Sequence, residues 1–176
     1  MTESFDLTSP HHFTPGTIGE PGQRVFFVQA AEGATTVTLK VEKTQVAALA
    51  QYMAELLADL PPVPDDELPF DLELLEPVVA EWVVGTIGVA FDENRDRMVV
   101  TFQELQVVEE SDDPLLVDDV DAAGSLATVV VTRPQAMGFV RRAAELVSSG
   151  RPPCTLCGRP LDPEGHVCIK TNGHLH

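Results

Sequence analysis

The residues best suited to chemistry in this sequence are three cysteines and a histidine near its carboxyl end. Cys154 and Cys157 form a C-x-x-C pair that Gly158 follows directly, and His166 and Cys168 form an H-x-C pair. A tight turn through C-x-x-C-G can direct both sulfurs to one point, and glycine permits the positive φ angle that this turn requires. Residues two apart in an extended segment point the same way, so His166 and Cys168 can complete a tetrahedral site. The pattern predicts a structural zinc ion.

Two alternatives to zinc are a redox dithiol and reduced thiols that bind nothing. A redox C-x-x-C pair follows a strand and opens a helix, because the helix N-terminus stabilises the thiolate. Here residues 151–153 are Arg-Pro-Pro, and Gly158, Pro160 and Pro163 follow, which favours a loop. His174 is the alternative fourth ligand, and His166 is favoured because it lies beside Cys168.

The net charge limits the partners that the protein can have. The chain has 176 residues and a formal net charge of −17, from 28 acidic and 11 basic residues. Nucleic-acid binding requires a basic footprint, so the charge argues against DNA and RNA as ligands of the tail. An acidic surface suits a soluble protein or one that meets a basic partner.

The sequence also indicates a compartment. No apolar run approaches the length of a membrane span, and the amino terminus lacks the pattern of a signal peptide. Three cysteines clustered in one motif do not make a disulfide framework, which favours a reducing environment. We therefore expect a cytoplasmic protein that does not associate with membranes.

The first half of the chain shows one hairpin and one helix. Strands are expected at residues 24–31 and 35–41, joined by a turn that contains Gly33. A helix is expected over residues 44–60, with Thr44 as its N-cap and apolar residues repeating at intervals of three and four. Residues 1–23 lack periodicity and are expected to form a loop, in which His11 and His12 are solvated.

The second half shows three more strands and a second helix. A proline-rich and acidic segment crosses the surface over residues 61–76, with a possible short strand at 72–75. Strands are expected at 80–91, 97–108 and 126–132, and residues 109–121 form an acidic, solvated loop. The second helix is expected over residues 134–148, with Gly150 after its end.

This order of elements predicts an α+β fold. Hairpin connections imply a largely antiparallel sheet with both helices packed on one face. We expect residues 1–150 to form this domain and residues 151–176 to form a small tail, similar to a zinc knuckle, that docks on it.

Two further features raise the possibility of phosphate binding. Residues 16–22 contain glycines at their first, fourth and seventh positions, but a strand follows where a phosphate loop requires a helix. Arg141 and Arg142 are an adjacent basic pair that can grip an anion, although a helix flank that neutralises nearby acids is favoured.

Three segments carry a resemblance to a known family: residues 19–26 (GEPGQRVF), 81–88 (EWVVGTIG) and 151–168 (RPPCTLCGRPLDPEGHVC). In these the chain resembles an uncharacterised family of actinobacterial conserved hypothetical proteins, a domain of unknown function. Its members are generally encoded beside a histidine-phosphatase-like protein and a phosphoinositide-kinase-like protein. The resemblance implies a cytoplasmic protein that acts with those neighbours, and it implies no particular reaction.

The sequence favours a non-enzymatic binding or adaptor domain with a protein partner and a structural zinc site. It contains neither a P-loop nor a nucleophile elbow. The alternative is an enzyme, or an enzyme subunit, that acts on a phosphorylated metabolite. This alternative rests on the phosphatase-like and kinase-like neighbours that the resemblance implies, on the glycines of residues 16–22 and on the pair Arg141 and Arg142.

Overall fold

The computed structural model of the chain describes residues 2–20, 22–107, 124–149 and 154–158. Its elements in chain order are β1 (Ser4–Leu7), β2 (His12–Ile18), β3 (Val25–Glu32), β4 (Thr35–Val41), α1 (Lys43–Ala58), the short 3-10 helix η1 (Asp65–Glu67), β5 (Trp82–Asp92), β6 (Arg97–Glu104), β7 (Leu126–Val131) and α2 (Arg133–Ser149). The α+β class predicted from the sequence is confirmed, as are both helices.

The strands form one seven-stranded sheet in the order β1-β7-β6-β5-β4-β3-β2. Most neighbours are antiparallel, but β1 pairs with β7 and β4 pairs with β5 in parallel. The expectation of a largely antiparallel sheet is therefore corrected to a mixed one. The reason is that the chain crosses from β4 to β5 through α1 and a long connection, and such a crossover delivers a parallel strand.

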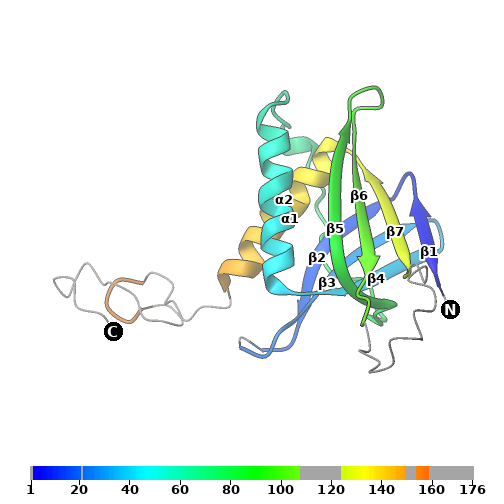
Figure 1. Ribbon diagram of the computed structural model, residues 1–176. Helices are drawn as coiled ribbons and strands as arrows, with labels where there is room; N and C mark the ends of the chain where they lie inside the picture. Colours follow the sequence, from blue (N-terminus) through cyan, green and yellow to red (C-terminus); the bar gives the residue numbers. More distant parts are fainter. Residues whose placement is uncertain (1, 21, 108–123, 150–153, 159–176) are drawn as a thin grey trace, which may run out of the picture.

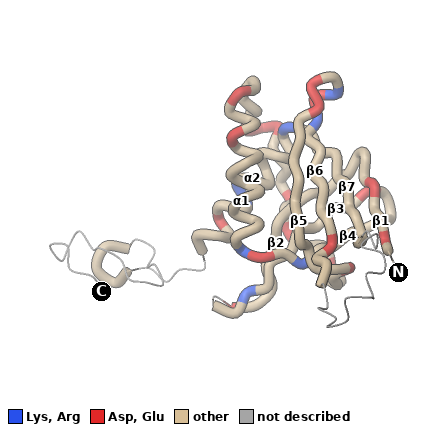
Figure 2. The backbone as a smooth tube through the Cα atoms, in the orientation of Figure 1, with Lys and Arg blue, Asp and Glu red and all other residues tan. Residues whose placement is uncertain are grey.

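The sheet is strongly curled. β1 and β2 are consecutive in the chain yet stand at opposite ends of the strand order. Figure 1 shows the half made of β2, β3 and β4 crossing behind β5, β6 and β7, with α1 and α2 side by side against the sheet. Charged positions gather at the ends of the strands, and the middles of β5, β6 and β7 carry none (Figure 2).

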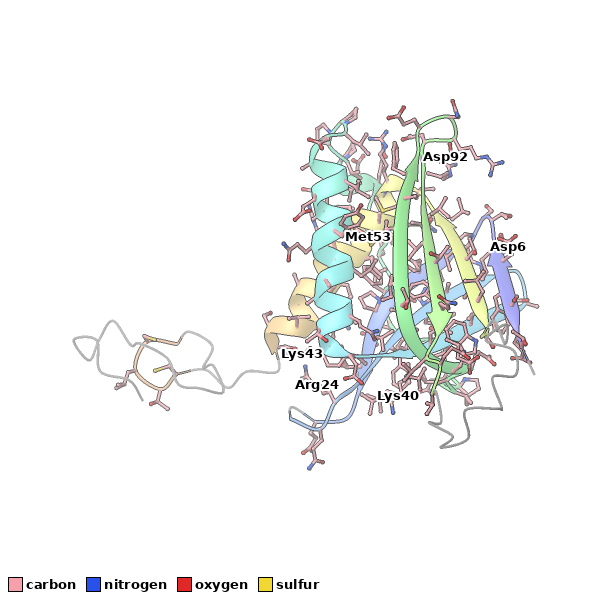
Figure 3. The ribbon with its side chains drawn as sticks, viewed as in Figure 1. Asp6, Arg24, Lys40, Lys43, Met53 and Asp92 are labelled. Atoms are coloured by element: carbon pink, nitrogen blue, oxygen red, sulfur yellow. The ribbon has the colours of Figure 1, made fainter. Side chains whose placement is uncertain are left out.

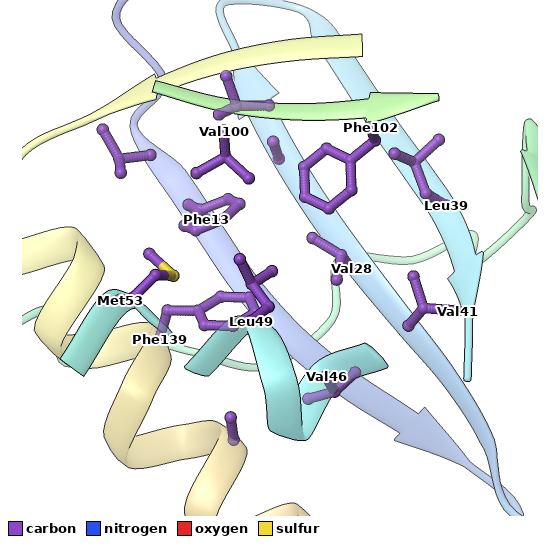
Figure 4. Packing of buried hydrophobic residues seen from close by; sticks show 14 of the residues in the cluster. Phe13, Val28, Leu39, Val41, Val46, Leu49, Met53, Val100, Phe102 and Phe139 are labelled. Carbon is purple, nitrogen blue, oxygen red and sulfur yellow. The ribbon is translucent and has the colours of Figure 1, made fainter. Parts of the chain in front are cut away.

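The hydrophobic core lies between the curled sheet and the two helices. Met53 points from α1 toward the strands (Figure 3), and it is completely buried. Phe13 of β2 stacks on Phe139 of α2 with ring centroids 4.8 Å apart. Figure 4 shows Val100 and Phe102 of β6 meeting these side chains from the other half of the sheet. Both helices pack on one face, as the sequence predicted.

The connection of residues 61–81, which we call the strap, is fastened to the sheet by buried polar side chains. Thr14, Gln29 and Thr38 lie opposite one another on β2, β3 and β4. The Gln29 amide donates to the Leu75 carbonyl (3.0 Å) and accepts from the Leu75 N–H (2.7 Å). Thr14 Oγ1 donates to the Leu72 carbonyl (2.8 Å). The short strand predicted at residues 72–75 is therefore wrong, because a side chain takes the place of a strand ladder.

The loop predicted for residues 1–23 is also wrong, because β1 and β2 form there. Pro15 and Gly16 interrupt the pattern of β2, yet an edge strand tolerates a proline that lacks an N–H. A Cβ at Gly16 would overlap the side chain of Leu74 in the strap. His12 is only 7% exposed, so the prediction of a solvated histidine pair is wrong at that position.

Smaller corrections concern the ends of elements. The N-cap of α1 is Glu42 rather than Thr44, because Gln45 and Glu42 form a capping box. β6 ends at Glu104, earlier than predicted. The acidic loop predicted at residues 109–121 lies outside the described residues. No helix among the described residues is long and apolar enough to span a membrane.

Candidate functional site

The described part of the predicted zinc tail is a tight turn. Residues 155–157 form the turn, and the Gly158 N–H donates to the Cys154 carbonyl at 2.8 Å. Gly158 has the positive φ predicted for it, 73°. Cys154 is buried and Cys157 is half-buried. His166, Cys168 and His174 lie outside the described residues, so the metal site stays a prediction whose donor chemistry suits zinc.

The arginine pair of α2 is engaged with carboxylates rather than turned to a common ligand. Arg141 forms a salt bridge of 2.8 Å with Asp65 in the strap, and Arg142 forms one of 3.1 Å with Glu145 one turn along α2. This agrees with the favoured interpretation of a helix flank that neutralises acids. Arg141 therefore fastens the strap to α2, and Arg142 neutralises an acid on the surface of the same helix.

The glycines of residues 16–22 do not form a phosphate loop. Gly16 lies within β2, and Gly19 and Gly22 have positive φ angles of 104° and 92° in the connection to β3. A strand follows them, whereas phosphate loops place their amides at the start of a helix. These glycines therefore shape a strand and a hairpin.

The feature that offers a binding surface is the edge of β5. This strand pairs with β6 over nearly its whole length, from Val84 to Asp92. It pairs with β4 only at Trp82 and Val83. Among the described residues, no strand pairs with that edge of β5 beyond Val83. Its backbone groups there are available to a further strand.

A groove of about 650 Å³ runs between this edge and α1. The helix contributes Gln45, Ala48, Leu49 and Tyr52, and β5 contributes residues 85–89. The lining contains no charged side chain, and Tyr52 is 49% exposed. An uncharged, largely apolar groove beside an open strand edge suits an extended peptide.

Gln45 fixes one end of the groove. Its Oε1 accepts the Glu42 N–H at 2.8 Å, which caps α1. Its Nε2 donates to the Val84 and Gly85 carbonyls at 3.2 and 3.3 Å, which ties the helix to β5. No other hydrogen bond joins α1 to β5 among the described residues, so the groove beyond Gly85 is open.

Among the described residues that precede the tail, the buried titratable side chain is His12. Desolvation by burial lowers the pKa of His12, while the Gln29 amide and the Asp71 carboxylate oppose that change. Its Nε2 is buried with no hydrogen-bond partner in the described part of the chain. Burial therefore favours the neutral imidazole, and the charge of His12 is linked to the stability of the fold.

A comparison with family descriptions identifies the chain. Residues 5–168 match the family described as Protein of unknown function (DUF3090). The chain belongs to this family. The match ends at Cys168, so the four predicted zinc ligands lie inside the DUF3090 region and His174 lies beyond it. No curated protein and no solved structure matches the chain.

Reasoning from the sequence missed the groove of this DUF3090 member. The opening depends on how soon β4 and β5 separate, which is a property of two distant segments. Tyr52 and Gln45 carry a weak signal, since both are large residues off the apolar stripe of α1. The sequence provides no direct sign that they face a strand edge.

Proposed function

We propose that this protein is a non-enzymatic binding domain that takes up an extended segment of a partner protein along β5. The observation that carries the proposal is the edge of β5 beyond Val83, which lacks a strand partner among the described residues and faces an apolar groove. A peptide that adds to an open edge gains main-chain hydrogen bonds, and side-chain pockets beside the edge provide specificity.

The groove also indicates the size and charge of its occupant. From Gln45 to Tyr52 the helix rises roughly 10 Å at about 1.5 Å per residue. A strand rises about 3.3 Å per residue, so the groove accepts about three residues of extended chain. The net charge of −17 favours a basic partner, because opposite charge accelerates encounter and suppresses acidic competitors.

The binding test uses peptides selected from a random library on the full chain. A peptide that adds to β5 should slow amide exchange at alternate residues of 85–91, because the amides that do not face β6 gain strand partners. Ala48→Phe fills the groove from an exposed position and should weaken peptide binding by at least about tenfold. Gln51→Phe places the same side chain on α1 outside the groove and should leave binding unchanged. Peptides that bind both variants like the wild type would refute the proposal.

The proposal includes a structural zinc ion held by Cys154, Cys157, His166 and Cys168. The turn at Gly158 supports it, and the end of the DUF3090 match at Cys168 favours His166 over His174. Four protein ligands leave no open position for water, so the ion would secure the tail rather than perform chemistry. Thiolate ligands suit the reducing cytoplasm expected from the sequence.

Metal analysis of the purified chain tests this part. We expect about one zinc per chain, lost in Cys154→Ser and kept in His174→Gln. Thiol titration of the native protein should show slow reaction that a chelator accelerates. A metal-free wild type with rapidly reacting thiols would contradict the zinc site and leave the β5 proposal standing, because the groove contains none of these residues.

The alternative function, action on a phosphorylated metabolite, keeps little support from the residues that suggested it. Arg141 and Arg142 are bound to Asp65 and Glu145, and the glycines lie in β2 and its hairpin. Any phosphate chemistry in the described residues must use other cations.

A further inference from the structure

Three basic residues differ from the other described arginines and lysines because neither an acidic side chain nor a pair of backbone carbonyls neutralises them. Arg95, Arg133, Arg141 and Arg142 each form a salt bridge. Arg97 donates to the carbonyls of Arg95 and Asp96. In the described part of the chain, the cations with no carboxylate partner and no such carbonyl contacts are Arg24, Lys40 and Lys43. This is unexpected in a chain with 28 acidic residues.

These three cations line the same pocket, which has a volume of about 400 Å³. Arg24 directly precedes β3, Lys40 lies in β4, and Lys43 is the first residue of α1. The register that pairs Phe26 with Val41 brings them to the same end of the hairpin. Figure 3 labels all three at the lower end of the molecule.

The pocket is positively charged. Its lining includes the carboxylate of Glu42, so three cations and one anion leave a net charge of +2. Glu42 belongs to the capping box of α1, which directs it to the backbone of the first turn. The N-terminus of a 16-residue helix adds a partial positive charge at the same place. Cations gathered in this way repel one another unless an anion joins them.

Arg24 is held in position from outside the hairpin. Its Nη1 donates to Ser149 Oγ at the end of α2, at 2.6 Å. A guanidinium has five N–H donors, so the others can serve a ligand. A planar donor group beside two ammonium groups matches the oxygens of a phosphate.

We propose that this pocket binds a small molecule through a phosphate group that carries two or three negative charges, such as a phosphate monoester or a diphosphate. The net charge of +2 and the helix N-terminus attract such an anion, and the volume lies in the range of small-molecule sites. A nucleic acid is disfavoured because the cluster is isolated on a chain of charge −17. The pocket shares no residue with the groove of β5, so this site is independent of the proposed function.

Calorimetric titration of the full chain with diphosphate, at low ionic strength, tests the proposal. We expect one site per chain, and we expect the double variant Lys40→Gln, Lys43→Gln to weaken it by at least about tenfold. Arg141→Gln makes the same kind of charge change at an ion-paired position and should stay within about twofold of the wild type. Thermal denaturation of each variant, compared with the wild type, establishes that it is folded.

The following results would overturn the site. Diphosphate could produce no binding heat with the wild type, the double variant could bind as the wild type does, or Arg141→Gln could weaken binding as much as the double variant. Sulfate at the same ionic strength distinguishes phosphate recognition from general anion attraction. Equal affinity for sulfate and diphosphate would also refute the proposal. Peptide binding to β5 is unaffected by any of these results.

Discussion

The sheet meets its covering elements in two different ways. Under the strap, the buried side chains of Thr14 and Gln29 form hydrogen bonds to the strap backbone, and neither side chain is exposed. Beside α1, the edge of β5 beyond Val83 has hydrogen bonds to Gln45 alone in the described part of the chain, and a groove separates helix and strand over the rest.

The difference separates a stabilising contact from a binding surface. Buried polar groups must find partners within the fold, so the strap cannot leave its position without breaking the hydrogen bonds that satisfy the buried Gln29 amide. The backbone groups on the edge of β5 beyond Val83 face a groove that water can enter, and another backbone can take the place of such water at small cost. A substitution under the strap should therefore affect stability, whereas one at the groove should affect binding.

The largest effect is expected for Gln29→Leu. The substitution removes both hydrogen bonds from the buried Gln29 side chain to the partly buried backbone of Leu75, so we expect a loss of about 2–4 kcal/mol in unfolding free energy. Urea denaturation measures it. Gln51→Leu, the same change at an exposed glutamine of α1, should cost less than about 0.5 kcal/mol. Equal effects at the two positions would remove the distinction between strap and surface.

Gly16→Ala should have the next largest effect. Its Cβ would overlap the Leu74 side chain, and overpacking of this kind costs about 1–3 kcal/mol. Leu74→Ala removes the overlapping atoms, so the double variant should lose much less stability than the two single variants predict. A double-mutant cycle by thermal denaturation measures this coupling. Strict additivity would mean that the strap does not pack on Gly16.

A pH-dependent effect is expected from His12. Its pKa in the folded state is lowered from 6.5, so between the two values the unfolded chain binds more protons. Stability is then full above 6.5 and declines as the pH falls toward the lower, folded value. Denaturation of wild type and His12→Asn over this window should show a smaller decline in the variant. His11→Asn, at an exposed position, should decline like the wild type. A His12→Asn profile parallel to that of the wild type would exclude His12 as a source of the decline.

The smallest effect on stability is expected for Gln45→Ala. It removes the capping contact to Glu42 and the bonds to Val84 and Gly85 on a partly exposed surface, for about 0.5–2 kcal/mol. Amide exchange in the first residues of β5 should increase while β6 is unaffected. A loss as large as that of Gln29→Leu would show that the groove, too, is a stabilising contact.

The elements predicted best are those whose pattern is local. The helix stripe through Leu49 and Met53 and the hairpin turn at Gly33 are visible in the sequence, because both follow from local backbone geometry. β1 and β2 were missed because their pairing partners are distant. A strand that contains Pro15 and Gly16 is specified by what lies beside it rather than by its own pattern.

The sequence by itself determined the α+β class, most element bounds and the donor set proposed for zinc. These depend on residue types and on spacing along the chain, which the sequence states directly. Only the tertiary structure decided that the sheet is mixed, that Gln29 and Thr14 fasten the strap, and that Arg24, Lys40 and Lys43 line one pocket. The tertiary structure also decided that β4 separates from β5 after Val83, which opens the groove. Each of these joins residues far apart in the chain, and such contacts arise from the packing of whole elements.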